Sequence, residues 1–86
     1  MTLRFIGVDP DTGQQGSPTI WIDDASGEII VQGWKPSPDL EAACAASPAP
    51  GHTPGIPAHE AVVRIPARRV PMLREACDVA ERTRLS

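Results

Sequence analysis

Large side chains are scarce in this chain, which has no tyrosine, one phenylalanine and two tryptophans among its 86 residues. No stretch approaches the roughly 18 apolar residues that a membrane-spanning helix needs, and the N-terminus lacks the charged and apolar regions of a secretory signal. We therefore expect a cytoplasmic protein without a membrane partner, in which the two cysteines stay reduced. With so few aromatic rings, each is expected to contribute to a core or to an interface.

An excess of positive charge is also missing, since the formal net charge is −3. Residues 1–43 carry seven acidic and two basic side chains, whereas residues 44–86 carry four acidic and six basic ones. Proteins bind nucleic acids largely by neutralising phosphates. The charge balance therefore disfavours nucleic-acid binding by this domain alone, although arginines of the second half could form a local basic patch.

A single small domain is the expectation for residues 1–86, because a second domain needs a longer chain. Alternation of apolar and polar residues predicts a meander of three strands at residues 2–8, 18–23 and 28–34. A further alternating segment, 60–65, predicts a fourth strand that ends at Pro66. The predicted fold class is α+β, with an antiparallel four-stranded sheet, a short helix and a longer C-terminal helix.

The short helix is predicted to follow Ser37, a favourable N-cap, with Pro38 at the first helical position. The C-terminal helix is predicted over residues 70–82. Its buried stripe is expected to consist of apolar residues at helical spacing, namely Val70, Leu73, Ala76, Cys77 and Ala80. Residues 47–57 lie between the two helices and contain four prolines and two glycines, so we expect an exposed and mobile loop there.

Alternation also predicts an apolar surface on the sheet. Ile20 and Ile22 lie on one side of their strand and Trp21 on the other. If the long helix covers the isoleucine side, the opposite face carries Trp21, Ile30 and Trp34. A monomer rarely leaves such a patch bare, so these three are predicted interaction residues. The alternative is that the short helix or the Pro-rich loop covers them.

Residues 5–13, with the sequence FIGVDPDTG, resemble the opening of the ribonuclease-H-like nucleases, in which a strand ends in a metal-binding aspartate. The resemblance covers about a third of the chain and implies Asp9 as the metal ligand, with Asp11 where that family often has glycine. Two-metal hydrolysis needs several converging carboxylates, and the remaining acids of the second half lie on a strand start and a solvated helix face. We therefore favour a strand that ends in an Asp-Pro turn.

Three arginines, Arg64, Arg68 and Arg69, flank the corner between the predicted fourth strand and the last helix. Contact with phosphate is one role for them, but surface arginines are more often solvated or paired with acids. Soft metal ligands are limited to two cysteines and two histidines, Cys44, His52, His59 and Cys77. Their spacing matches no compact zinc pattern, so we expect no metal, no cofactor and no catalytic residue.

Three strings stand out, GSPTIW at 16–21, VQGWK at 31–35 and HEAVVRIP at 59–66. Together they resemble a group of short actinobacterial proteins that are often encoded beside helix-turn-helix regulators. The resemblance spans most of the chain except the Pro-rich loop, and it carries over no activity and no functional residue. It implies an accessory role in regulation by association alone.

The expected function is therefore that of a non-enzymatic protein-interaction module, a partner of a transcription regulator, with a homodimer as one form. The predicted interaction residues are Trp21, Ile30, Trp34, Arg64, Arg68 and Arg69. Two alternatives stay open: a divalent-metal nuclease fragment centred on Asp9, and direct nucleic-acid binding through the three arginines.

Overall fold

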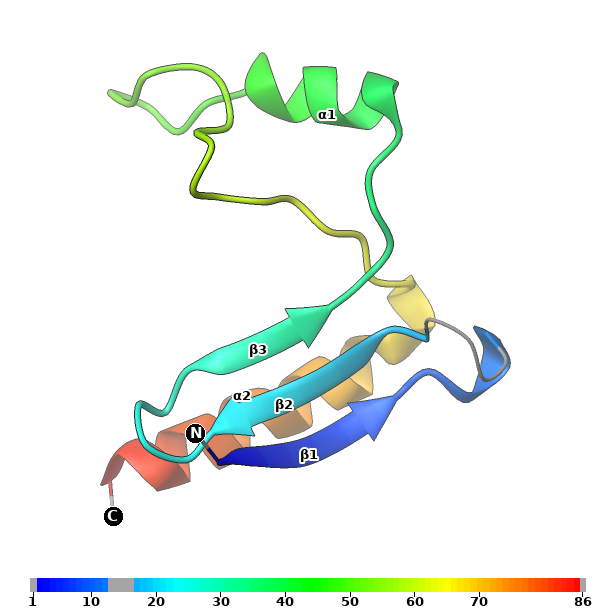
Figure 1. Cartoon of the computed structure of the whole chain (residues 1–86), viewed down its shortest axis with the longest axis vertical. Coiled ribbons are helices and arrows are strands. Elements are labelled where there is room, and N and C mark those ends of the chain that lie inside the picture. Colours follow the sequence, from blue (N-terminus) through cyan, green and yellow to red (C-terminus); the bar gives the residue numbers. More distant parts are fainter. Residues whose placement is uncertain (1, 13–16, 86) are drawn as a thin grey trace. The chain divides into compact units, whose positions relative to one another are not determined.

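The structure is a computed structural model that describes residues 2–12 and 17–85. Its antiparallel sheet has the order β1-β2-β3, formed by β1 (Leu3–Val8), β2 (Thr19–Asp23) and β3 (Ile29–Gln32) (Figure 1). The other elements are the 3₁₀ turns η1 (Pro10–Thr12) and η2 (Ala67–Arg69) and the helices α1 (Pro38–Ala45) and α2 (Val70–Leu85). The predicted α+β class and the meander are confirmed.

The β2–β3 hairpin is fixed by its turn. The N–H of Gly27 donates to the carbonyl of Asp23 at 2.8 Å, and Gly27 has a φ of 76°, which suits glycine. A carboxylate oxygen of Asp23 accepts the N–H of Ala25 at 2.9 Å, which closes an Asx turn. The register that follows places Trp21 opposite Ile30.

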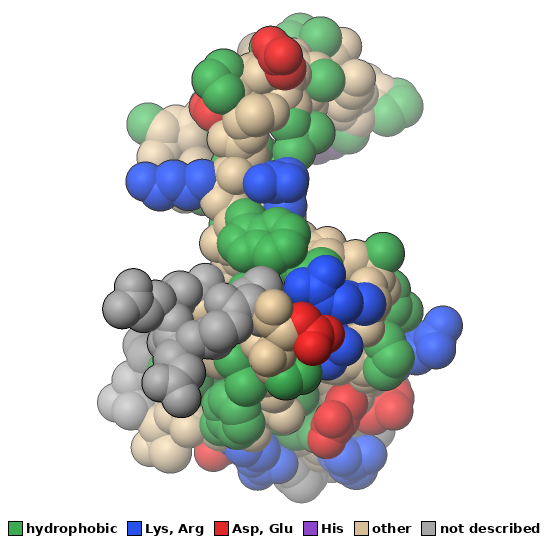
Figure 2. All heavy atoms as spheres, turned by 90° about the vertical axis from the view of Figure 1, so that its right-hand side faces the viewer, with side chains coloured by type: hydrophobic (Ala, Val, Ile, Leu, Met, Phe, Trp, Pro, Cys, Tyr) green, Lys and Arg blue, Asp and Glu red, His purple; other side chains and the backbone are tan. Residues whose placement is uncertain are grey.

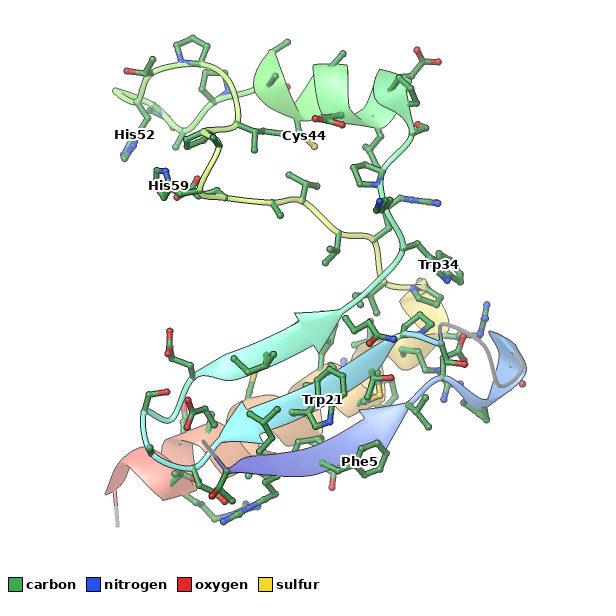
Figure 3. All side chains as sticks on the ribbon, viewed as in Figure 1. Phe5, Trp21, Trp34, Cys44, His52 and His59 are labelled. Atoms are coloured by element: carbon green, nitrogen blue, oxygen red, sulfur yellow. The ribbon has the colours of Figure 1, made fainter. Side chains whose placement is uncertain are left out.

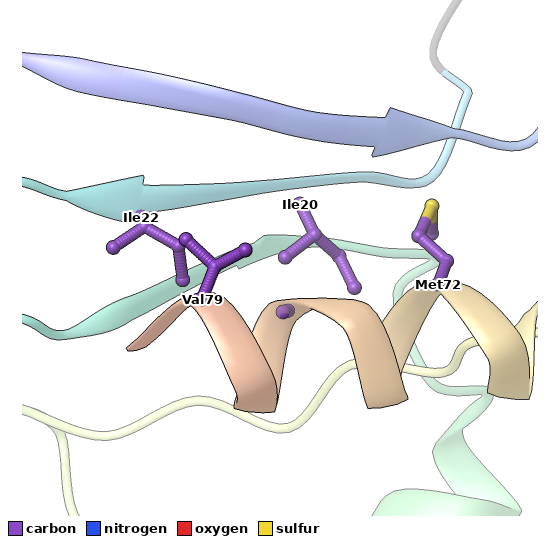
Figure 4. Packing of buried hydrophobic residues seen from close by; sticks show 5 residues of the cluster. Ile20, Ile22, Met72 and Val79 are labelled. Atoms are coloured by element: carbon purple, nitrogen blue, oxygen red, sulfur yellow. The ribbon is translucent and has the colours of Figure 1, made fainter. Parts of the chain in front are cut away.

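The hydrophobic core lies between α2 and one face of the sheet (Figure 4). From the sheet, Ile20 and Ile22 are fully buried. The helix contributes Met72, Ala76 and Val79, which recur at i, i+4 and i+7. Of the predicted stripe only Ala76 lies in the core. The rest was misplaced by part of a turn: Leu73 and Ala80 pack at the margin of the core, Val70 is 39% exposed, and Cys77 is exposed.

A β-bulge interrupts β1. The pairing register shifts between Phe5 and Gly7, so that Gly7 lies opposite Ile20 and Val8 opposite Thr19. Simple alternation places Val8 on the face opposite Phe5; the extra residue returns Val8 to the same face. Gly7 faces α2 closely, because a Cβ atom there would lie 2.8 Å from the sulfur of Met72.

The predicted fourth strand, residues 60–65, is wrong for the described residues, which show only an isolated bridge at Arg64. Arg64 and Trp34 exchange both backbone hydrogen bonds, at 2.8 and 2.9 Å. In an antiparallel ladder the next hydrogen-bonded pairs would be two residues away on each strand. One of those pairs would contain Pro36 and the other Pro66, and proline has no N–H to donate. The ladder therefore consists of the Trp34–Arg64 pair alone and extends in neither direction.

Helix α1 begins as predicted, because the Ser37 hydroxyl accepts the N–H of Leu40 at 3.2 Å and Pro38 occupies the first turn. None of its residues is buried. The segment 47–57 contains no helix or strand, as predicted, and Gly51 and Gly55 adopt positive φ there. The mobility of this loop stays a prediction.

The chain divides into two compact units by its internal contacts. The sheet unit comprises Met1–Gly33 and Ile65–Ser86, and the α1 unit comprises Trp34–Arg64. The sheet unit contains the whole hydrophobic core described above. The single domain expected for residues 1–86 stays a prediction.

Candidate functional site

The face of the sheet opposite α2, here called the open face, carries apolar side chains from all three strands. Phe5, Trp21 and Ile30 are direct cross-strand neighbours and form a row across the sheet. Leu3 and Val8 lie on the same face of β1, on either side of Phe5. In Figure 3 the rings of Phe5 and Trp21 lie in front of the strands, whereas α2 lies behind them.

The side chains of the open face differ sharply in exposure from those of the core. Phe5 is 59% exposed and Leu3 43% exposed, and Trp21 and Ile30 are half-buried. Ile20 and Ile22, the neighbours of Trp21 in β2, are completely buried. A three-stranded sheet with one helix can bury only one of its two faces in this way. The open face is therefore an apolar surface that the core does not use.

Two predicted interaction residues, Trp21 and Ile30, lie in this row, but Trp34 does not. Trp34 lies beyond the end of β3, in the α1 unit. The prediction that it belongs to the third strand and shares a face with Trp21 is therefore wrong. The guanidinium of Arg64 stacks 5.4 Å from the centroid of its ring. Arg64 also donates from Nε to the carbonyl of Lys35 at 3.5 Å. Arg64 thus belongs with Trp34.

Arg68 and Arg69 form a different group, in which they bind two acidic side chains. Arg68 contacts both carboxylate oxygens of Asp9, through Nη2 at 2.7 Å and Nε at 3.4 Å. The Nε of Arg69 is 3.4 Å from Asp9. Asp11 lies 3.4 Å from Arg68 and 3.8 Å from Arg69. We call these four residues the Asp9 cluster. Figure 2 views the side where η1 and η2 lie and shows basic side chains gathered around an acidic one.

The electrostatics of the cluster favour an ionised Asp9. Burial raises the pKa of Asp9, but the hydrogen bonds from Arg68 and from the backbone N–H of Asp11, with the charges of both arginines, hold that pKa below its ordinary value. The side chain of Asp9 is completely buried, whereas that of Arg68 is 44% exposed. Two cations and two anions together leave the cluster without net charge.

This arrangement bears on the chemistry that Asp9 can perform. A metal ion at Asp9 would have to displace the guanidinium of Arg68 and then share the site with two cations. Phosphate at Arg68 and Arg69 would have to compete with two aspartates that already bind them. The geometry therefore favours a structural role for the cluster, which connects the end of β1 to the beginning of α2.

The soft metal ligands are divided between the two units. Cys44, His52 and His59 belong to the α1 unit (Figure 3). Cys77 lies on α2. Across residues 2–12 and 17–85, no three His, Cys, Asp or Glu side chains lie together in a group that could hold a metal ion. Within the same residues, no helix combines the length and the apolar character needed to cross a membrane.

No protein-family model matches the chain, and comparison with curated proteins and with solved structures finds no match. The open face and the Asp9 cluster are therefore interpreted from their own geometry.

The sequence prediction missed three residues of the open face, Leu3, Phe5 and Val8, of which Phe5 is the most exposed. Alternation places Leu3 and Phe5 on one side of the first strand, but it does not show which side of that strand faces α2. The missing information was the pairing of Phe5 with Trp21, which depends on the register between two strands.

Proposed function

We propose that this chain is a non-enzymatic protein-interaction module, and that it binds its partner through the open face. The observation that carries the proposal is the row Phe5–Trp21–Ile30, whose outermost ring is 59% exposed. Burial of apolar area stabilises a complex by roughly 25 cal/mol per Å² before the costs of association. Phe5 and Trp21 have large apolar side chains, so their burial by a partner would contribute most to the free energy of binding.

The composition of the open face also fits an interface. Protein interfaces are rich in aromatic residues at their centres and poor in charged ones. The side chains in the row are uncharged, and the acid at the margin of the face, Asp23, is buried and accepts N–H groups of its own turn. A partner would therefore not need to desolvate a free charge at the centre of this surface.

The first partner to test is a helix-turn-helix regulator. Support for this choice comes only from the resemblance to actinobacterial proteins encoded beside such regulators. No observation favours the two alternatives, a metal-dependent nuclease centred on Asp9 and nucleic-acid binding through the arginines. The reason is that Asp9 forms ion pairs with Arg68 and Arg69.

The proposal is tested by cross-linking in the native host followed by mass spectrometry, with wild type and three variants of the chain. Wild type and Val63→Ala should recover the same partner, since Val63 is an exposed apolar residue of the α1 unit. Phe5→Ala and Trp21→Ala should recover much less of it. If all versions recover the partner equally, the open face is not the binding surface.

A further inference from the structure

Strand β1 is an edge of the sheet, and its outward backbone groups can be identified from the hydrogen bonds to β2 and to its flanks. The N–H of Asp24 donates to the carbonyl of Thr2 at 3.1 Å, and the N–H of Asp9 donates to that of Pro18 at 2.8 Å. In an antiparallel pair, residues directed toward the partner strand alternate with residues directed away from it. Thr2 and Arg4 are directed toward β2, so the N–H and C=O of Leu3 and Phe5 point outward.

This edge has some, but not all, of the features that keep sheet edges from pairing. Such features are proline, lysine, inward-pointing charges and short strands. β1 is the longest of the three strands, with six residues, and it contains neither proline nor lysine. Within the described residues no strand pairs with its outer side. Two protective features are present: the charged Arg4, which lies opposite Ile22 on the side of β1 that faces α2, and the bulge after Phe5. The bulge limits regular pairing to the part of β1 that contains Leu3 and Phe5.

We infer that the β1 edge binds the β1 edge of a second copy of this chain, to give a continuous six-stranded antiparallel sheet. Only one symmetric register uses both outward residues of each strand. It pairs Leu3 with Phe5 of the other copy and Phe5 with Leu3, with the two-fold axis at Arg4. This register forms four main-chain hydrogen bonds and aligns the open faces of both copies side by side.

The charges at the axis are compatible with this register. The two Arg4 side chains would be direct cross-strand neighbours, and like charges in that position are unfavourable. Each Arg4, however, already pairs with its own Asp24 at 3.2 Å. The four side chains at the axis are therefore neutral together. Asp24→Asn would leave the two arginines facing each other, and Arg4→Gln would remove them.

The inference is distinct from the proposed function, because it depends on backbone groups at an edge and not on side chains of the open face. It is tested on the full chain, without an N-terminal tag, by sedimentation velocity over a wide concentration range. Asp24→Asn should raise the dimer dissociation constant by roughly 2- to 5-fold. The double variant Arg4→Gln/Asp24→Asn should bring the dimer dissociation constant back to the wild-type value.

Hydrogen exchange gives the decisive second readout. The amides of Leu3 and Phe5 should exchange more slowly as the concentration rises, whereas the amide of Arg4 should be protected at all concentrations. A chain that stays monomeric overturns the inference. A dimer in which the amides of Leu3 and Phe5 remain unprotected also overturns it, and would leave binding through the open face untouched.

Discussion

Asp9 and Arg68 are 59 positions apart in the sequence, yet a carboxylate oxygen of Asp9 lies 2.7 Å from Nη2 of Arg68. The contact joins the residue after β1 to the turn η2 that leads into α2. It therefore helps to fix where the helix begins on the sheet. Because Asp9 is completely buried, removal of either partner would leave the other without its main electrostatic contact.

Acid should destabilise the protein partly through Asp9. The pKa of Asp9 is lowered in the folded state, so its ionised form stabilises the fold above about pH 4. That contribution is lost as the pH falls through the folded-state pKa. Asp9→Asn should unfold more easily than wild type at pH 7 and lose less stability between pH 7 and pH 3.

Urea unfolding at several pH values measures this effect. Asp78→Asn, on the outer side of α2, serves as the control and should follow wild type. Equal pH dependence in Asp9→Asn and wild type would show that the Asp9 cluster does not contribute.

Gly7 and Met72 should be energetically coupled. A methyl group at position 7 would lie 2.8 Å from the sulfur of Met72, so Gly7→Ala should destabilise the fold by about 1–3 kcal/mol. Met72→Ala makes room, and the double variant should therefore be less destabilised than the sum of the single ones. In Gly27→Ala, where no atom lies within 4 Å of the added methyl, the cost should not depend on Met72. Full additivity of Gly7→Ala and Met72→Ala would contradict the close contact.

Shortening the Pro-rich loop should change stability little. No residue between 47 and 57 is buried, and the segment contains no helix or strand. Replacement of residues 48–54 by a short Gly-Ser linker should leave the melting temperature within a few degrees of wild type. A large fall would show that the loop packs against the rest of the chain.

The chain should not cleave nucleic acid. Asp9, the residue that the nuclease resemblance implies as a metal ligand, is bound by Arg68. Branched and single-stranded DNA, incubated with magnesium or manganese, should show no cleavage above the level of an Asp9→Ala control. Cleavage that depends on Asp9 would overturn the proposal of a non-enzymatic module.

The sequence was sufficient for the elements whose signals are local. The N-cap at Ser37 and the start of α2 at Val70 are encoded within a few residues, and both agree with the structure. The fourth strand failed because alternation in 60–65 says nothing about the partner strand, where Pro36 cannot continue the ladder.

The remaining errors have a common physical origin in long-range packing. Two overlapping apolar stripes exist on α2, and only contact with Ile20 and Ile22 selects the one that contains Met72 and Val79. The bulge in β1 and the pairing of Asp9 with Arg68 also depend on segments distant in sequence. Because the sequence does not show that Asp9 pairs with Arg68, Arg68 was predicted to contact a binding partner instead.

The most direct test of the proposed function compares Phe5→Ala with Ile20→Ala, by unfolding free energy and by the dissociation constant for the partner identified through cross-linking. Phe5→Ala should change the unfolding free energy by less than about 0.5 kcal/mol and weaken binding by roughly 30-fold or more. Ile20→Ala should lower the unfolding free energy by about 2–5 kcal/mol. If Phe5→Ala destabilises the fold as much as Ile20→Ala and leaves the dissociation constant unchanged, Phe5 belongs to a core and the open face is not an interface.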